Sequence, residues 1–234
     1  MFHPRWRRAE SGRPPPGRAR RGTRPRSPCQ PGSSGRLADG VFAIVITLLV
    51  LEIAVPENLS GDALRLVLDE LRPTLVAWVI SFLITGMYWV SHRDLFSGIR
   101  TVNRDLVWLN LLFLLPVALI PFAASVLGRY PDEPVALHLY GVVVIAASAM
   151  RLLLLWYAPR RPALLWPDAV AERVGVAIAI AAAPIPVYLV AIAVAGASTT
   201  LSGLLYLAVP FLYFLLVTLL RERPGTRTEA DEFT

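Results

Sequence analysis

Long apolar stretches are the feature of this sequence that most restricts its fold. The chain is 55% hydrophobic and only 17% charged, which is too apolar for a single water-soluble core. A helix needs about 17 to 25 apolar residues to cross the hydrocarbon of a bilayer. The sequence therefore predicts an all-α integral membrane protein with six transmembrane helices, at about residues 39–55, 73–91, 106–127, 135–158, 174–197 and 201–220.

The arginines between these stretches predict how the helices are oriented. They gather in the second and fourth loops and at the carboxyl end, whereas the third loop has only Arg129 and the fifth has none. Loops rich in arginine stay on the cytoplasmic side. We therefore expect both termini to be cytoplasmic, as an even number of crossings requires.

The amino-terminal region has a different composition from the rest of the chain. Residues 1–36 hold ten of the 23 arginines, seven prolines and one acid, Glu10. Such a segment cannot bury a core. It is interpreted as a disordered tail attracted to anionic lipid, as a nucleic-acid-binding arm, or as sequence upstream of the true start. We expect no nucleic-acid partner, and predict a tail or misassigned start at 1–36, the membrane domain at 37–222 and a polar cytoplasmic tail at 223–234.

A few polar residues are expected together at the cytoplasmic ends of the first three spans. Asp39 begins the first span, Trp89 and His92 end the second, and Asn110 lies early in the third. Odd spans start and even spans end on the cytoplasmic side, so these side chains lie at similar depth and can form a polar network that links three helices. For Asp39 a purely structural role is equally open, because a carboxylate at the start of a helix accepts backbone N–H bonds.

The first span also carries a regular stripe of aliphatic residues. Ile44, Leu48 and Leu51 recur at helical spacing, with Thr47 on the flank of the same face. Such a stripe lines a pore, packs against another helix or faces lipid, and the Thr47 hydroxyl can simply bond back to its own helix. Glu52 follows near the outer end, where a carboxylate attracts cations at a pore mouth or is merely hydrated at the interface.

Other kinds of site have little support in the sequence. Motifs of metalloproteases, serine hydrolases and phosphate-binding loops are missing, and the three histidines are scattered. We therefore expect no enzyme activity, no metal and no cofactor. Arg151, inside the fourth span, is expected to extend its side chain to the inner interface. Prolines are expected to kink the later helices at positions 116, 121, 184, 186 and 210.

Three phrases in the first half of the chain resemble the transmembrane protein 175 family, the potassium channels of endosomes and lysosomes and their prokaryotic relatives. They are DGVFAIVITLLVLEI, MYWVSHRDLF and WLNLLFLLPVALIPFAASVLGRY, in this order. Departures from the family pattern lie at the start of the first helix, where Leu37 and Ala38 replace Phe and Ser, and in the second phrase, where Arg93 replaces a histidine. The resemblance covers residues 37–157 well and the last two spans only by hydropathy.

The resemblance implies a prokaryotic six-helix subunit of a homotetramer, in which the first helix lines a central pore in the plasma membrane. It implies that Ile44 forms the constriction, that Leu48 and Leu51 form further aliphatic rings, and that Thr47 is the hydroxyl layer linked to selectivity. Glu52 would lie at the outer mouth. The predicted function is a leak-type channel for potassium ions.

Two other functions stay open on the sequence. A proton-coupled secondary transporter would need a buried ionisable carrier and interrupted helices. A non-conducting membrane scaffold or sensor would use the same stripes only for packing. Potassium flux through the purified protein distinguishes the three.

Overall fold

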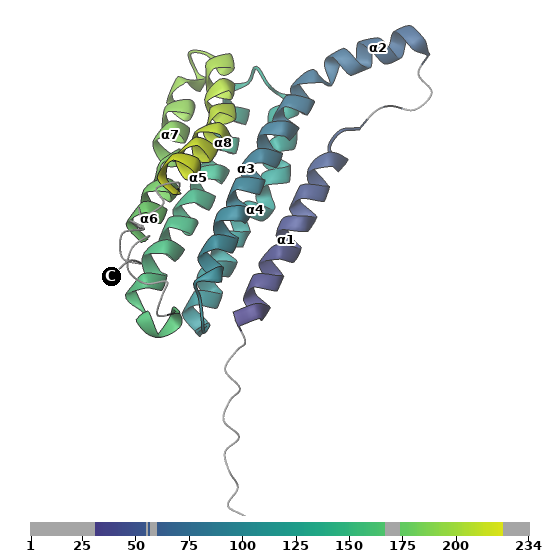
Figure 1. Cartoon of the computed structure of the whole chain (residues 1–234). Helices are drawn as coiled ribbons and strands as arrows, with labels where there is room; N and C mark the ends of the chain where they lie inside the picture. Colours follow the sequence, from purple (N-terminus) through teal and green to yellow (C-terminus); the bar gives the residue numbers. More distant parts are fainter. Residues whose placement is uncertain (1–30, 55, 57–59, 167–173, 222–234) are drawn as a thin grey trace, which may run out of the picture.

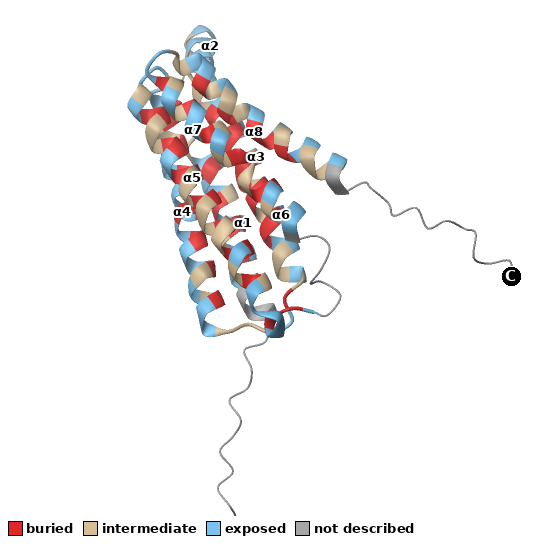
Figure 2. Cartoon of the chain, turned by 90° about the vertical axis from the view of Figure 1, so that its left-hand side faces the viewer, coloured by how far each residue is buried: buried red, intermediate tan, exposed pale blue. Residues whose placement is uncertain are grey.

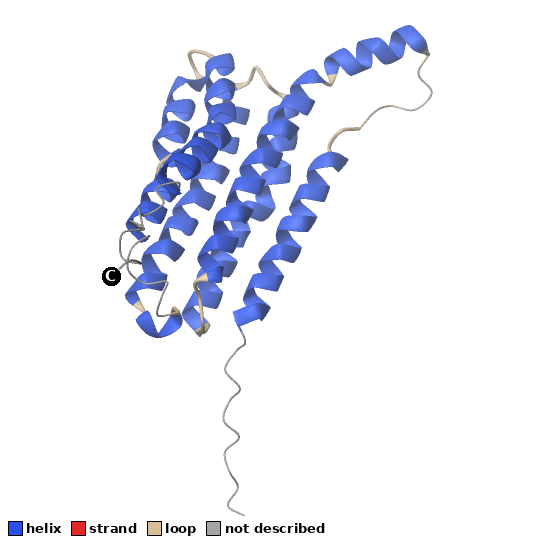
Figure 3. Ribbon diagram, viewed as in Figure 1, coloured by secondary structure: helices blue, strands red, loops and turns tan. Residues whose placement is uncertain are grey.

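The computed structural model describes residues 31–54, 56, 60–166 and 174–221, and this part of the chain is helical apart from short connections and one isolated bridge (Figures 1 and 3). Its composition explains this, because backbone groups within a bilayer must be satisfied inside each segment. The elements are α1 (Pro31–Leu51), α2 (Gly61–Glu70), α3 (Arg72–Ser97), α4 (Arg104–Arg129), α5 (Pro134–Tyr157), the 3₁₀ turns η1 (Ala158–Arg160) and η2 (Pro162–Leu164), α6 (Val174–Ala182), α7 (Pro184–Ala195) and α8 (Thr199–Arg221).

Five stretches in the described part of the chain are long and apolar enough to cross a membrane. They correspond to the second through sixth predicted spans. The first predicted span corresponds to α1, which includes Arg36 and Asp39 and is not one of the five. The five stretches are Arg72–Ser97, Arg104–Arg129, Pro134–Arg160, Gly175–Ala195 and Thr199–Leu219.

The ends of the chain differ in part from the prediction. The first helix begins at Pro31, so residues 31–36 of the predicted disordered tail are helical. Proline is well suited to a first helical position, because the N–H it lacks would have no partner there. Residues 1–30 and the predicted tail at 223–234 lie outside the described residues.

Prolines affect the helices in two ways. Pro116 and Pro121 lie within α4, and Pro210 lies within α8, and each of these helices continues through them. By contrast, the fifth predicted span is divided, because α6 ends at Ala182 and α7 begins at Pro184. Proline removes a backbone donor and is tolerated at the start of a helix, which explains why the division falls there.

The helices stand side by side in a bundle, with α1 at one edge (Figure 1). There α1 packs against α3 and α4, while α5 packs against α4 on one side and α7 on the other. Close α3–α4 contact is possible because residue 128 is glycine: a Cβ there would lie 2.8 Å from the Thr74 Cα, and the Thr74 hydroxyl donates to the Gly128 carbonyl at 3.2 Å.

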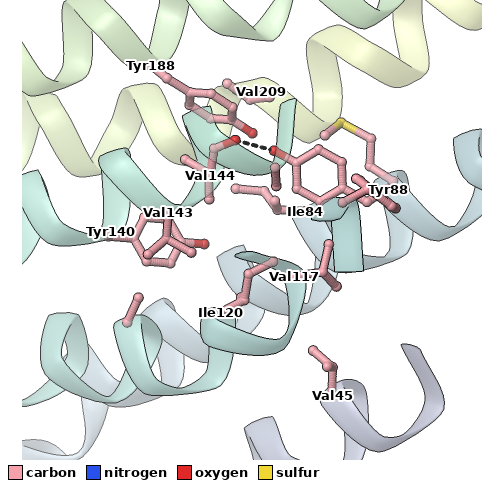
Figure 4. Packing of buried hydrophobic residues seen from close by; sticks show 14 of the residues in the cluster. Val45, Ile84, Tyr88, Val117, Ile120, Tyr140, Val143, Val144, Tyr188 and Val209 are labelled. Carbon is pink, nitrogen blue, oxygen red and sulfur yellow. Dashed lines mark hydrogen bonds between the residues drawn. The ribbon is translucent and has the colours of Figure 1, made fainter. Parts of the chain in front are cut away.

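Tyrosine hydroxyls bond the middle of the bundle together. The Tyr88 hydroxyl on α3 donates to the Val144 carbonyl of α5 at 2.8 Å, and Figure 4 shows this bond among buried aliphatic side chains. Tyr140 lies 3.0 Å from the Ser81 hydroxyl, and Tyr206 on α8 donates to the Leu137 carbonyl at 2.9 Å. Buried tyrosines need such partners, so these bonds fix how α3, α5 and α8 align.

Arg151 is a correction to the sequence prediction. Its side chain does not reach the interface but is only 4% exposed, with its guanidinium carbon 5.7 Å from the centre of the Tyr213 ring. The cause is tertiary, because α8 covers the face of α5 from which Arg151 projects. The face of an aromatic ring attracts a guanidinium, so the Tyr213 ring partly stabilises the buried charge of Arg151.

The segment between α1 and α3 is also more ordered than predicted. It was expected to be a loop, but residues 61–70 form α2, which projects from the bundle beyond the end of α1 (Figure 1). None of its residues is buried, and Asp69 near its carboxyl end forms an ion pair with Arg72, the first residue of α3. Ten residues are too few to span a bilayer, which is why a search for long apolar runs missed this helix.

The opposite end of the bundle is held by backbone bonds between two connections. The Arg100 N–H donates to the Leu164 carbonyl at 2.7 Å, and the Trp166 N–H donates to the Gly98 carbonyl at 3.1 Å. These bonds join the α3–α4 connection to the segment after α5. The amino end of α1 also lies at this end of the bundle, with the carboxyl end of α3 and the amino end of α4 (Figure 1).

Candidate pore-lining surface and inner polar cluster

Helix α1 has two faces of different character. The face packed on α3 and α4 carries residues that are at most 2% exposed, namely Ala38, Phe42, Val45 and Leu49. Figure 2 colours the ribbon by burial and shows buried stretches alternating with exposed ones along the helices. The predicted stripe lies on the other side, where Ile44 is 59%, Leu48 43% and Leu51 72% exposed. Among the described residues, then, this stripe is largely uncovered and remains available to a pore, a neighbouring subunit or lipid.

Thr47 is on the exposed side of α1 as well. Its hydroxyl donates to the Ile44 carbonyl at 2.8 Å. This is the local bond expected of a helical threonine, although it reaches three residues back. Because the hydroxyl proton is used in this bond, the lone pairs of Oγ1 remain for a cation or for water.

Glu52 has a basic neighbour that the sequence analysis did not pair with it. The Arg129 Nη2 lies 3.5 Å from the Glu52 Oε2, which joins the end of α1 to the end of α4. The Glu52 side chain is one-third exposed and that of Arg129 two-thirds, so the pair is screened by water. The attraction of Glu52 for cations is therefore partly offset by an adjacent positive charge.

Asp39 and Trp89 are brought together at the other end of α1. The Trp89 Nε1 donates to the Asp39 Oδ1 at 2.9 Å, which ties α1 to α3. The Arg93 guanidinium carbon lies 5.6 Å from the centre of the same indole ring. Trp89 thus interacts with a carboxylate through its edge and a cation through its face, the geometry each group favours.

His92 and Asn110 form the second pair. The His92 Nε2 lies 2.8 Å from the Asn110 Oδ1, linking α3 to α4, and both side chains are at most 3% exposed. The imidazole stacks between two phenylalanines, with centroid distances of 4.3 Å to Phe96 and 5.4 Å to Phe113. A buried polar pair of this kind holds its neighbours in one arrangement, because breaking it leaves a polar group unpaired.

The four predicted residues therefore form two bonded pairs. Phe42 of α1 lies beside the second pair, with its ring centroid 5.9 Å from that of His92. Phe42, Phe96 and Phe113 were not predicted from the sequence to belong to this cluster. The one indication in the sequence was that each of the same three helices carries a phenylalanine. Phenylalanine is common in apolar spans, where it also packs in the core or faces lipid, so this indication was too weak to predict the cluster.

Nothing in the described part of the chain resembles a metal centre, because no three histidine, cysteine, aspartate or glutamate side chains are grouped there. The stripe of α1 is aliphatic apart from the Thr47 hydroxyl, and the inner pairs add a carboxylate, an indole, an imidazole and an amide.

Comparison with known proteins identifies the family. Residues 35–121 match the family model described as "Endosomal/lysosomal potassium channel TMEM175". A potassium channel of Streptomyces collinus is 40% identical over 149 residues, which cover 60% of this chain and 72% of the relative. This chain belongs to the TMEM175 family. The resemblance predicted from the sequence is confirmed.

Other TMEM175 relatives agree over shorter ranges. A potassium channel of Chryseobacterium sp. is 37% identical over 121 residues, half of this chain and 61% of the relative. The mouse protein named "Endosomal/lysosomal proton channel TMEM175" is 28% identical over 132 residues, and the match spans only 26% of its length. The mouse protein is therefore matched over about a quarter of its chain.

A solved TMEM175 structure has the same fold. The crystal structure of a lysosomal potassium-selective channel TMEM175 homolog from Chamaesiphon minutus superposes with a TM-score of 0.70 at 28% identity, covering 79% of this chain and 96% of that one. The match extends past residue 157, the limit of the clear resemblance in sequence. The prediction of an all-helical membrane protein is therefore confirmed over most of the chain.

Proposed function

We infer that this chain forms a potassium-permeable channel. Membership of the TMEM175 family, a relative at 40% identity named as a potassium channel, and the fold shared with a potassium-selective homolog support this function. No enzyme activity is proposed, because the helices bring together no catalytic constellation within the described residues.

We propose that α1 is a sixth membrane span, with both termini cytoplasmic and the subunit in a prokaryotic plasma membrane. Its 21 residues extend about 30 Å at 1.5 Å per residue, the thickness of the hydrocarbon core. The end of the bundle at Arg100 and Arg104 also carries Arg160 and Arg161, and its arginines outnumber its acids, whereas at the α2 end the acids outnumber the arginines. This charge asymmetry supports a cytoplasmic position for the first end.

The observation that carries the pore proposal is the exposed aliphatic face of α1. We propose a homotetramer in which four copies of this face surround a common axis, with Ile44 at the constriction and Leu48 and Leu51 as further rings. A narrow aliphatic ring excludes water, so that an ion passes only when the ring widens enough to be hydrated.

Thr47 supplies the polar layer of this proposal. Its back-bonded hydroxyl turns the oxygen lone pairs outward, where they replace part of the hydration lost by a cation at the constriction. Potassium loses its water more easily than the smaller sodium ion, so a narrow pore with weak ligands favours potassium. The mouth at Glu52 attracts cations weakly, because Arg129 lies beside it.

Potassium flux into liposomes containing the purified full-length chain tests the function. We expect potassium flux that does not saturate and needs no proton gradient. The substitution Ile44→Asn should raise this flux and lower the preference for potassium over sodium, because an amide hydrates the constriction.

Leu115→Asn is the matched control for this experiment. Leu115 is 62% exposed in the middle of α4, so the substitution makes a similar chemical change outside the proposed pore. Flux that is equal in Ile44→Asn and the unaltered chain would exclude α1 as the pore helix. Saturating flux that depends on a proton gradient would indicate a transporter. No flux at all would favour a non-conducting scaffold or sensor.

A further inference from the structure

Two adjoining crevices lie between α1 and α3 at the end of the bundle that we propose is cytoplasmic. One has a volume of about 350 Å³ and is lined by polar and aromatic side chains, among them Arg36, Arg93 and Phe96. The other, of about 380 Å³, is lined mainly by apolar side chains, including Ala43 and Ile46. Both volumes are in the range of small-molecule sites. Asp39 and Arg93 line both crevices, which therefore form one continuous groove.

The polar half of the groove favours an anion. Arg36 and Arg93 are exposed, and neither is ion-paired with a carboxylate among the residues that the structure describes. Asp39 is the one acid lining this half, and its Oδ1 accepts the Trp89 N–H. Arg93 lies over the Trp89 ring, which limits the positions its guanidinium adopts. Two arginines beside one hydrogen-bonded carboxylate leave a net positive charge.

The apolar half continues from this charge toward the middle of the bilayer. From Asp39 to Ile46 the helix rises about 10 Å. Over that distance the groove is walled by Phe42, Ala43 and Ile46 of α1 and by Trp89 of α3. A polar interface site that opens into an apolar slot matches a phospholipid, with its phosphate at the arginines and one acyl chain along α1. A soluble anion such as phosphate has no apolar part that could occupy the slot.

We propose that this groove binds an anionic phospholipid of the cytoplasmic leaflet. Basic pockets between transmembrane helices on that side attract anionic headgroups, and tryptophan is frequent at the same depth. Asp39, Ala43 and Ile46 lie about 140° around α1 from the stripe of Ile44, Leu48 and Leu51. A bound lipid therefore lies along a side of α1 that faces away from this stripe. That it regulates conduction rests on the proposed channel function, whereas the binding itself does not.

Native mass spectrometry of the purified full-length chain tests the binding. The probes are phosphatidylglycerol, phosphatidylcholine and inorganic phosphate. We expect phosphatidylglycerol to be retained in preference to phosphatidylcholine, and the double substitution Arg36→Gln/Arg93→Gln to weaken its retention about 25-fold, taking about fivefold for each arginine near a membrane surface. Arg100→Gln/Arg104→Gln is the matched control. It removes two charges from the same end of the bundle, outside the groove, and should change retention far less.

Ala43→Phe separates a lipid from a free phosphate. It fills the apolar slot without changing the charge, so it should reduce retention of phosphatidylglycerol. Retention that Ala43→Phe leaves intact, or that inorganic phosphate abolishes, would overturn the lipid assignment in favour of a plain anion site. Equal losses in the two double variants would overturn the site itself. Loss of the oligomer with lipid retention unchanged would mean that a second copy covers the groove.

Flux measurements then test the regulatory part. In liposomes containing phosphatidylglycerol, Arg36→Gln/Arg93→Gln should alter potassium flux more than Arg100→Gln/Arg104→Gln does, and the difference should vanish in pure phosphatidylcholine. A difference that persists in phosphatidylcholine would refute regulation by the lipid. If the chain carries no potassium in any liposome, the channel proposal fails and the binding result still stands on its own.

Discussion

The contact of α5 with α7 and α8 depends on the absence of a side chain at Gly141. A Cβ at this position would collide with the Tyr206 hydroxyl oxygen and lie 2.5 Å from Cγ1 and 2.7 Å from Cδ1 of Ile192. Tyr206 cannot simply move away, because it is fully buried and its hydroxyl donates to the Leu137 carbonyl at 2.9 Å. The substitution Gly141→Ala should therefore destabilise the subunit.

The expected size follows from opposing contributions. Overpacking costs about 1–3 kcal/mol, and losing the Tyr206 hydrogen bond costs about 0.5–1.5 kcal/mol. Replacing glycine by alanine inside a helix raises the free energy of unfolding by about 1 kcal/mol. The net destabilisation is about 2 kcal/mol. Gly203, one turn before Tyr206 on α8, is the matched control, because a Cβ there meets nothing within 4 Å. Gly203→Ala should leave stability unchanged or raise it by up to about 1 kcal/mol.

Reversible unfolding in mixed detergent micelles, followed by tryptophan fluorescence, measures both variants. Because the helix-propensity gain is common to them, their difference isolates the collision and should be about 3 kcal/mol, or roughly a hundredfold in the unfolding equilibrium. Equal unfolding free energies for Gly141→Ala and Gly203→Ala would refute the close packing of α5 against Ile192 and Tyr206.

Three further predictions concern the inner pairs and the outer mouth. Asn110→Leu leaves the His92 imidazole unpaired between two phenylalanines and should lower the free energy of unfolding by about 1–3 kcal/mol. The double variant Asn110→Leu/His92→Phe should recover most of that loss. If it recovers none, the pairing of His92 with Asn110 is contradicted. Asp39→Ala should lower the apparent melting temperature by removing the acceptor for the Trp89 N–H. Asp39→Asn keeps an acceptor oxygen and should lower the melting temperature less. Equal decreases in the two variants would exclude the Asp39–Trp89 hydrogen bond as the cause. Arg129→Gln should raise potassium conductance at low salt, and Glu52→Gln should lower it. Both effects should fade near 1 M salt, where the screening length is about 3 Å. Effects that persist at high salt would exclude an electrostatic origin.

The arrangement around α1 was largely predictable from sequence, because helical period and membrane depth are both encoded locally. The spacing of Ile44, Leu48 and Leu51 identified one face, and the alternation of inner and outer ends placed Asp39 near Trp89. Which polar groups bond to which depends on side-chain direction. The pairing of His92 with Asn110 thus required the structure.

Two features could not be predicted by counting apolar residues. Arg151 is buried because α8 covers it, and tertiary cover of one helix face by a distant helix leaves no local trace in the sequence. Helix α2 did leave a signal, since Leu64, Val67 and Leu68 share one side while Asp62 and Asp69 share the other. A helix of ten residues with several charges falls below the length that identifies membrane spans.

The two faces of α1 can evolve and be engineered separately. Ala38, Phe42, Val45 and Leu49 carry the attachment to the bundle, whereas the stripe at Ile44, Leu48 and Leu51 takes no part in folding the single subunit. Exchanges along the stripe therefore incur little folding penalty within one chain, so the surface that we propose lines the pore can change while the attachment of α1 to the bundle stays constant. A designer has the same freedom to alter the proposed pore surface on one side of a single helix.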